Sequence, residues 1–217
     1  MQPIRHDVPQ HHQDRTWAIY GKSVPQLFLE RVAGRPDVVA LRYKDFGLYQ
    51  EVTWKKYRDD VEAFALGLMS LGVEPGDRIA IMGDPCYEYF VADMAGLSVG
   101  AITYGIYTTC SPTEVRHQLE NAGAKIFIAE NQEYVDKILE LENLATDLRR
   151  IIVADMRAMF LYRDDRIVSF SGVQDQGRAS ARPGRRRSSS APLRSSPRMS
   201  RCSSTPPAPQ ARRRPRC

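Results

Sequence analysis

Four short apolar runs that alternate with helical segments limit most strongly how this chain can fold. Each run is bounded by turn or cap residues, and the four cover Arg78–Met82, Ala101–Tyr107, Lys125–Ala129 and Arg150–Ala154. Consecutive strands separated by helices need crossover connections, which produce a mostly parallel sheet covered on both faces. The pattern predicts an α/β fold with a partial doubly wound sheet.

The helices between these runs have start and stop signals. Asp84 with Pro85 can start the first, which ends at Gly100 and has its predicted buried face at Tyr87, Phe90, Met94 and Leu97. The second has a Ser cap, a Pro and a Glu at 111, 112 and 114, which is the pattern of a capping box, and it ends at Gly123. The third is predicted from Asn131 to about Asp147, with its apolar positions at Tyr134, Ile138, Leu141, Ala145 and Leu148.

An antiparallel hairpin is predicted before this alternating region. Its strands are Val38–Phe46 and Tyr49–Thr53, with Gly47 between them. A short helix precedes it, with a capping box at Ser23 and Gln26 and an end at Gly34. A longer helix follows from Thr53 to Gly72, and its apolar positions are spaced three or four apart at Trp54, Tyr57, Val61, Phe64, Ala65, Leu68 and Leu71.

The last 47 residues, Ser171–Cys217, differ from the rest of the chain. They hold twelve Arg, one acidic residue, no Lys and no aromatic residue, so the formal net charge of +5 is the sum of an acidic first part and a basic tail. Such a segment cannot bury enough apolar surface to fold, which predicts disorder. A frameshifted end is the favoured explanation, because Arg, Ala, Pro, Ser and Gly are the residues that GC-rich codons encode. The alternative is a basic arm that binds nucleic acid.

The N-terminal residues, the cysteines and one apolar stretch indicate the cellular compartment of the protein. Residues 1–22 form a polar leader without the apolar core of a secretory signal. The four Cys show no metal-binding or paired spacing, which favours free thiols in a reducing compartment, the cytoplasm. The apolar stretch Phe90–Tyr107 contains Asp93 and two glycines, so a buried helix followed by a strand is favoured over a membrane span.

No familiar catalytic motif occurs in the sequence. It lacks G-x-x-x-x-G-K-[ST], G-x-G-x-x-G after a strand, G-x-S-x-G and H-E-x-x-H. His117 has no carboxylate or nucleophile placed beside it by local spacing, and an exposed or packed role is favoured. Asp84 and Glu88 are four residues apart, and a cap and a solvated side chain explain them better than an acid/base pair.

Four phrases, taken together, nevertheless resemble the N-terminal part of the adenylate-forming superfamily, and within it the long-chain fatty acyl-CoA synthetases. They are residues 53–57 (TWKKY), 71–82 (LGVEPGDRIAIM), 95–104 (AGLSVGAITY) and 107–124, which combines YTTCSPTE with HQLENAGA. The resemblance runs from about Ser23 to Phe170. It divides the chain into the leader, 1–22; the first part of an AMP-binding domain, 23–170; and the tail, 171–217.

The resemblance implies an ATP-dependent ligase that activates a fatty acid as acyl-AMP and passes it to CoA, with Mg²⁺ assisting. The family's Ser/Thr/Gly-rich phosphate loop, its acidic ribose-binding residue and its C-terminal Lys have no counterpart here. No catalytic, cofactor-binding or metal-binding residue is therefore carried over, and we expect a truncated chain that is inactive by itself. Two alternatives stay open: a non-enzymatic interaction protein with a nucleic-acid-binding tail, and a short domain that still binds ATP or an acyl-adenylate.

The matching residues are therefore predicted to be scaffold. Gly72, Gly76, Gly100 and Gly123 are expected at turns and helix ends. The segment Gly105–Thr109 follows a predicted strand, where an α/β sheet places ligand-facing loops, so it could line an acyl or pantetheine channel in a complete enzyme. Mutation of Tyr107 in an intact homologue without loss of thioester formation would contradict this hypothesis.

Overall fold

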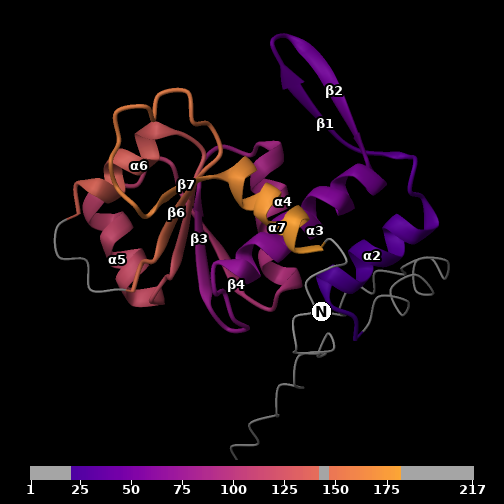
Figure 1. The fold of residues 1–217 in the computed structure, drawn as a ribbon, viewed down its shortest axis with the longest axis horizontal. Helices are drawn as coiled ribbons and strands as arrows, with labels where there is room; N and C mark the ends of the chain where they lie inside the picture. The colour runs from indigo at the N-terminus through magenta and orange to yellow at the C-terminus, as the bar shows by residue number, and fades with distance from the viewer. Residues whose placement is uncertain (1–20, 142–146, 182–217) are drawn as a thin grey trace, which may run out of the picture. The chain divides into compact units, whose positions relative to one another are not determined.

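A five-stranded parallel sheet forms the centre of the chain (Figure 1). The computed structural model describes residues 21–141 and 147–181. The strands are β3 (Arg78–Met82), β4 (Ile102–Ile106), β5 (Ile126–Ala129), β6 (Arg150–Val153) and β7 (Ile167–Ser169). Their order across the sheet is β4-β3-β5-β6-β7, and each neighbouring pair is parallel. The predicted α/β class and the four predicted strands are confirmed, and β7 is a strand that the sequence did not predict.

Alternation along the strands divides the apolar core into two layers. Ile79, Ile81 and Ile126 belong to one layer, and their chain neighbours Ala80, Met82 and Phe127 belong to the other. Because successive side chains on a strand point to opposite faces, strands buried on both sides become continuous apolar runs. The runs seen in the sequence are therefore the signature of a sheet with helices on both faces.

The helices fill those two layers. Side chains of α5 (Pro112–Ala122) and α6 (Gln132–Leu139) pack in the layer of Ala80 and Phe127. Side chains of α2 (Val24–Gly34), α3 (Trp54–Ser70), α4 (Tyr87–Ser98) and α7 (Phe170–Ala181) pack in the layer of Ile79 and Ile126. The sheet is thus doubly wound.

The predicted antiparallel hairpin is also confirmed. Strands β1 (Val39–Asp45) and β2 (Leu48–Thr53) pair only with each other, and Phe46 and Gly47 form the turn. Figure 1 shows the hairpin projecting away from the parallel sheet. Tyr43 of β1 stacks on Tyr87 of α4, with ring centroids 5.6 Å apart. This contact joins the hairpin to the helical layer.

Helix ends match the sequence signals closely. Ser23 with Gln26 and Ser111 with Glu114 form complete capping boxes, and Thr53 caps α3. Gly123 closes α5 in the left-handed conformation. The other three predicted turn glycines, at positions 72, 76 and 100, also have positive φ. Their role as turn and cap residues is confirmed.

Two helix predictions need correction. Asp84 does not start α4, because the cap position belongs to Cys86 and the Asp84 backbone N–H instead donates to Glu130. The buried face of α4 is Val91, Ala92, Ala95 and Gly96, one residue out of phase with the predicted face, and Phe90 is exposed. Small residues face the sheet here because α4 approaches it closely: a Cβ on Gly96 would lie 2.4 Å from Thr103 Cγ2.

The third predicted helix is shorter than expected. α6 ends at Leu139, so Leu141 lies beyond it, and Leu148 is buried in the segment that leads into β6. Ala145 lies outside the described residues. The apolar spacing persists past the helix end because Leu148 packs against the same layer from an extended segment.

The predicted disorder from Ser171 is wrong for residues 171–181, which form most of α7. Phe170 stacks on Phe64 with centroids 4.1 Å apart, and Val173 is buried in the same layer. Two apolar side chains are enough to anchor the helix because α3 offers a closely matched surface. Residues 182–217, where the rest of the basic tail lies, are outside the described residues.

Glycines bring α3 and α7 into backbone contact. A Cβ on Gly177 would lie 1.8 Å from the Ala63 carbonyl oxygen, and a Cβ on Gly67 would lie 2.2 Å from the Val173 carbonyl oxygen. Any larger side chain must therefore push the helices apart. The position of α7 depends on these two glycines.

Asp60 joins three helices from the same side of α3. Its side chain is 6% exposed and accepts hydrogen bonds from Lys56 Nζ (2.6 Å), Tyr87 Oη (2.7 Å) and Arg178 (3.2 Å). Burial, followed by the hydrogen bond and charge of Asp60, raises the pKa of Tyr87 far above its ordinary value. A buried carboxylate is tolerated here because donors from α3, α4 and α7 all reach it.

Within residues 21–141 and 147–181, no helix is both long and apolar enough to cross a membrane. The stretch Phe90–Tyr107 forms most of α4, the turn after it and β4, as predicted.

Gly177→Ala should lower the free energy of unfolding by about 3 kcal/mol, because overpacking at backbone contact forces α7 away from α3. Gly34→Ala is the matched control, since no atom lies within 4 Å of a Cβ there. Urea unfolding followed by circular dichroism measures both. Equal stability of the two variants would show that α7 is not held as described.

Asp60→Ala should lower the free energy of unfolding by about 2 kcal/mol, because Tyr87 and Arg178 lose a charged acceptor. The control is Asp175→Ala, which removes the exposed second partner of Arg178 and should change stability by less than about 0.5 kcal/mol. The same urea titration compares them. A similar loss in both variants would contradict the role given to Asp60.

Candidate functional site

The strand order creates one topological switch point. From β3 the chain crosses outward to β4 and then returns to the other side of β3 to form β5. The connections after β3 and β5 therefore pass over opposite faces of the sheet, through α4 on one face and α6 on the other. In open α/β sheets the crevice at the carboxyl ends of such strands is where ligands bind. The crevice between Met82 and Ala129 is accordingly the first candidate site.

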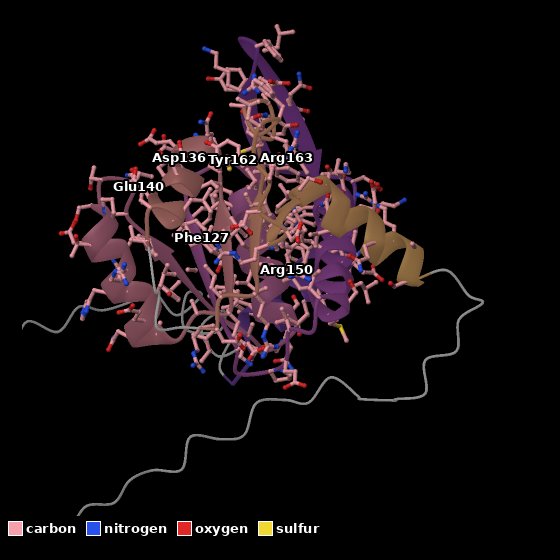
Figure 2. The ribbon with its side chains drawn as sticks, turned by 60° about the vertical axis from the view of Figure 1, so that its left-hand side comes forward. Phe127, Asp136, Glu140, Arg150, Tyr162 and Arg163 are labelled. Carbon is pink, nitrogen blue, oxygen red and sulfur yellow. The ribbon has the colours of Figure 1, made fainter. Side chains whose placement is uncertain are left out.

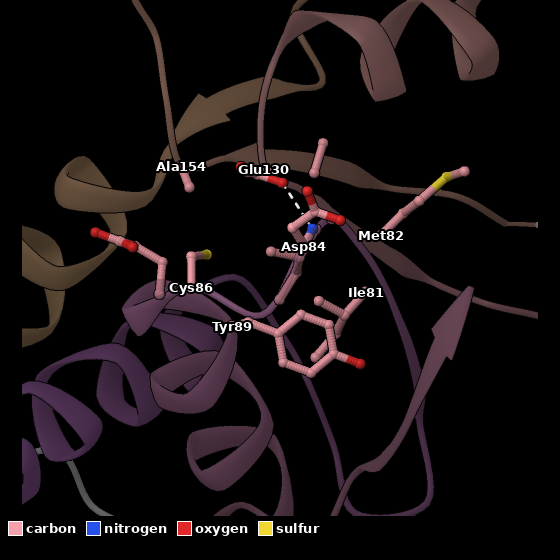
Figure 3. A pocket seen from close by; sticks show the side chains of 11 residues that line it. Ile81, Met82, Asp84, Cys86, Tyr89, Glu130 and Ala154 are labelled. Carbon is pink, nitrogen blue, oxygen red and sulfur yellow. Dashed lines mark hydrogen bonds between the residues drawn. The ribbon is translucent and has the colours of Figure 1, made fainter. Parts of the chain in front are cut away.

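Glu130 occupies this crevice (Figure 3). Its carboxylate accepts a hydrogen bond of 2.7 Å from the Asp84 backbone N–H, which holds the loop after β3 against the end of β5. A Cβ on Gly83 would lie 2.5 Å from Glu130 Cβ, so glycine is needed where the loop passes this side chain. The loop after β3 and the end of β5 are thus hydrogen-bonded to each other and leave little space for a ligand between them.

The crevice does not fit ATP. Its cavity volume is about 10 Å³ and its lining includes the carboxyl side chains of Asp84, Glu88 and Glu130. This volume is close to the minimum for one water molecule, and clustered carboxylates repel phosphate. Among the described residues, no three His, Cys, Asp or Glu side chains are grouped so that they could hold a metal ion.

Cys86 lines the same crevice (Figure 3). Burial raises the pKa of its thiol to about 11, with a smaller contribution from the charges of Glu88 and Glu130. The reactive form of cysteine is the thiolate, so Cys86 is a protonated packing residue at neutral pH. Cys86 and Cys110 are both free thiols, as predicted, and Cys202 and Cys217 lie outside the described residues.

The second candidate is the loop after β4, which includes the predicted ligand-facing segment Gly105–Thr109. Lys137 of α6 holds this loop: its Nζ donates to the carbonyls of Thr108 (2.7 Å) and Cys110 (3.3 Å). Tyr107, at the carboxyl end of β4, is 83% exposed. The loop is therefore anchored on one side and presents an aromatic ring to the outside on the other.

A polar network links α6 to the loop between β6 and β7, residues 154–166. Gln132 donates to Tyr162 Oη (2.6 Å), and Tyr162 donates to Asp136. Figure 2 shows Asp136 and Tyr162 side by side. The hydrogen bond to Asp136 raises the pKa of Tyr162. The network fixes one end of the long loop and leaves a surface hollow of about 330 Å³ against Phe160 and Leu161.

The structure places Asp84 and Glu88 together in the lining of the crevice and His117 away from them. His117 is exposed on α5, on the opposite side of the sheet from α4. Asp84 is exposed and Glu88 lies in the first turn of α4, so the predicted cap role of Asp84 is wrong. Sequence reasoning missed Glu130, Lys137 and Asp60. Position at a strand end could have pointed to Glu130, whereas the partners of Lys137 and Asp60 come from distant elements.

Comparison with known proteins gives the class to which this fold belongs. The family model described as AMP-binding enzyme matches residues 28–190. The chain belongs to the AMP-binding enzyme family. The match continues past Phe170, where the sequence resemblance was expected to end, and it includes the whole of α7.

Two curated relatives differ in how much of them the chain covers. It is 34% identical over 130 residues to long-chain-fatty-acid–CoA ligase FadD15 of Mycobacterium bovis, which is 60% of this chain and 22% of that protein. It is 37% identical over 103 residues to the uncharacterized protein Rv1549 of Mycobacterium tuberculosis, which is 48% of this chain and 57% of that protein. The chain thus spans about a fifth of FadD15, and Rv1549 is a much shorter protein than FadD15.

Solved structures show the same fold. Coronafacic acid ligase from Pectobacterium brasiliense superposes with a TM-score of 0.61 at 18% identity, covering 71% of this chain and 29% of the ligase. At this identity the likeness concerns the fold alone.

The Cys86 thiol should resist alkylation until the pH approaches about 11. Because only the thiolate reacts, the iodoacetamide rate should rise about tenfold per pH unit between pH 8 and 10. Peptide mapping by mass spectrometry measures it for this residue alone. Glu88→Gln removes one charge that raises the pKa and should move the curve to lower pH. A plateau near pH 8.5 in the unchanged chain would contradict the burial described.

Proposed function

We propose that this chain is the N-terminal scaffold segment of a long-chain fatty acid–CoA ligase. In the proposed reaction a fatty acid carboxylate attacks the α-phosphate of ATP, forming acyl-AMP and releasing pyrophosphate. The CoA thiolate then attacks the acyl carbonyl and releases AMP. The support is the family match together with the relative FadD15, whose name states this activity.

The observation that supports the proposed scaffold role is the closed switch point. Glu130 fills the crevice where an α/β sheet ordinarily binds a ligand, and the cavity beside it is about 10 Å³. Phosphate chemistry needs donors and cations arranged around the nucleotide. The described residues that line this crevice include no Lys or Arg, and the ammonium of Lys137 on α6 is committed to two loop carbonyls. ATP, Mg²⁺ and CoA are therefore proposed ligands of a complete ligase, and this chain alone is proposed to be inactive.

The direct test is a chimera in which this chain's residues replace the matched segment of FadD15. We expect the chimera to form acyl-AMP from ATP and a long-chain fatty acid at a rate within about a hundredfold of the parent, because scaffold replacement leaves the reacting groups unchanged. The 217-residue chain alone should form none in the same assay. Mass spectrometry detects the adenylate.

A folded chimera without acyl-AMP would contradict the scaffold role, as would acyl-AMP formation by the chain alone. A nucleic-acid-binding tail, the alternative class of function, concerns residues outside the described part of the chain, and no observation among the described residues favours it.

A further inference from the structure

Lys137 of α6 holds the turn that follows β4, residues 107–110. Its Nζ donates to the carbonyl oxygens of Thr108 (2.7 Å) and Cys110 (3.3 Å), and its side chain is 20% exposed. The side chain of Thr108 is also hydrogen-bonded to Tyr134, a buried residue of α6. Hydrogen bonds from a charged donor are roughly twice as strong as those between neutral groups. The turn is therefore attached firmly to α6.

The turn does not need this contact in order to form. The Cys110 N–H closes it by donating to the Tyr107 carbonyl (3.0 Å), and the capping box at Ser111 starts α5 directly afterwards. Thr109 is exposed, so the turn lies at the surface, where water can bond its carbonyls. Placing a mostly buried ammonium against neutral carbonyls has a desolvation cost, and its ion pair to Glu133 is long, 3.8 Å. The contact thus fixes where the turn lies rather than whether it forms.

Tyr107 is the residue whose position this contact controls. It follows Ile106, which is 4% exposed and pairs with Met82 at the end of β3. The backbone of Tyr107 is held by the strand on one side and by the turn on the other, while its side chain is 83% exposed. Because β3 ends at the switch point, Tyr107 lies at the carboxyl edge of the sheet, where α/β folds bind ligands. Its ring is an exposed aromatic surface on a fixed backbone.

We propose that Lys137 is a positioning residue for the ligase reaction and acts through Tyr107. It holds the turn so that the Tyr107 ring packs along the flexible chain of a substrate, either the alkyl chain of the fatty acid or the pantetheine arm of CoA. The inference rests on the proposed function. A contact made by an already ordered residue lowers the cost of binding, so the effect of Lys137 falls on KM rather than on kcat.

Hydrogen exchange in the 217-residue chain tests the hold itself. Lys137→Met removes the donors and keeps the apolar stem, so the Cys110 amide should exchange at least about tenfold faster. Lys137→Arg keeps a cation with several donors and should stay within about threefold of the unchanged chain. Glu133→Gln alters only the distant, exposed partner of Lys137 and, as the matched control, should change exchange by less than about twofold. Unchanged exchange at the amides of β5 shows that each variant folds.

Kinetics of acyl-CoA formation test the role in the reaction. In the chimera with FadD15, built to include residues 105–137 of this chain, Lys137→Met should raise the KM for the fatty acid or for CoA at least about tenfold and leave kcat within about threefold. Tyr107→Ala should have the same effect. Combining the two substitutions should add less than about twofold, because Lys137 acts only through Tyr107. The substrate whose KM rises identifies the chain that the ring contacts.

The outcomes separate this inference from the proposed function. A chimera that forms no acyl-AMP before any substitution contradicts the proposed function, and hydrogen exchange still decides whether Lys137 holds the turn. In an active chimera, unchanged KM values in Lys137→Met overturn the positioning role, as do independent effects of the two substitutions in the double variant. Equal exchange at Cys110 in Lys137→Met and in the unchanged chain overturns it as well.

Discussion

The contact between α3 and α7 is the constraint on which one side of the structure depends. Gly67 and Gly177 let the two backbones touch, and Asp60 then lies where Lys56, Tyr87 and Arg178 can all reach its carboxylate. α3 is thereby buried on two sides, by the sheet and by α7. Because Tyr87 also stacks on Tyr43, the position of the hairpin is linked to the same contact.

The switch point of the sheet and the surface around it differ in how much space they offer a ligand. The switch point between β3 and β5 is closed by Glu130, and the cavity beside it is about 10 Å³. Beyond the carboxyl ends of the strands, Lys137 holds the loop after Tyr107, and large apolar side chains are exposed on the hairpin and on the loop between β6 and β7. These features support the proposed scaffold role, in which the chain holds elements in place for chemistry performed by other groups.

Local signals predicted most of the fold and little of the site. Ser23, Thr53, Ser111 and Gly123 act on neighbouring residues, so their roles were visible in the sequence. α7 was missed because Gly67, Ala63 and Gly177 show their purpose only when a distant helix is in contact. Glu130 and Lys137 were missed for the same reason: their partners, Asp84 and the Thr108 carbonyl, lie on other elements. The predicted buried face of α4 was out of phase with the observed one, because small residues rather than large ones face the sheet.

Hydrogen exchange at the amides of residues 42–51 tests the central claim, that this fold is a scaffold with an uncovered hairpin. We predict fast exchange in the chain alone, much faster than at β3 and β5, because every residue from Arg42 to Glu51 is exposed. Protection of the hairpin equal to that of β5 in the isolated chain would contradict the account.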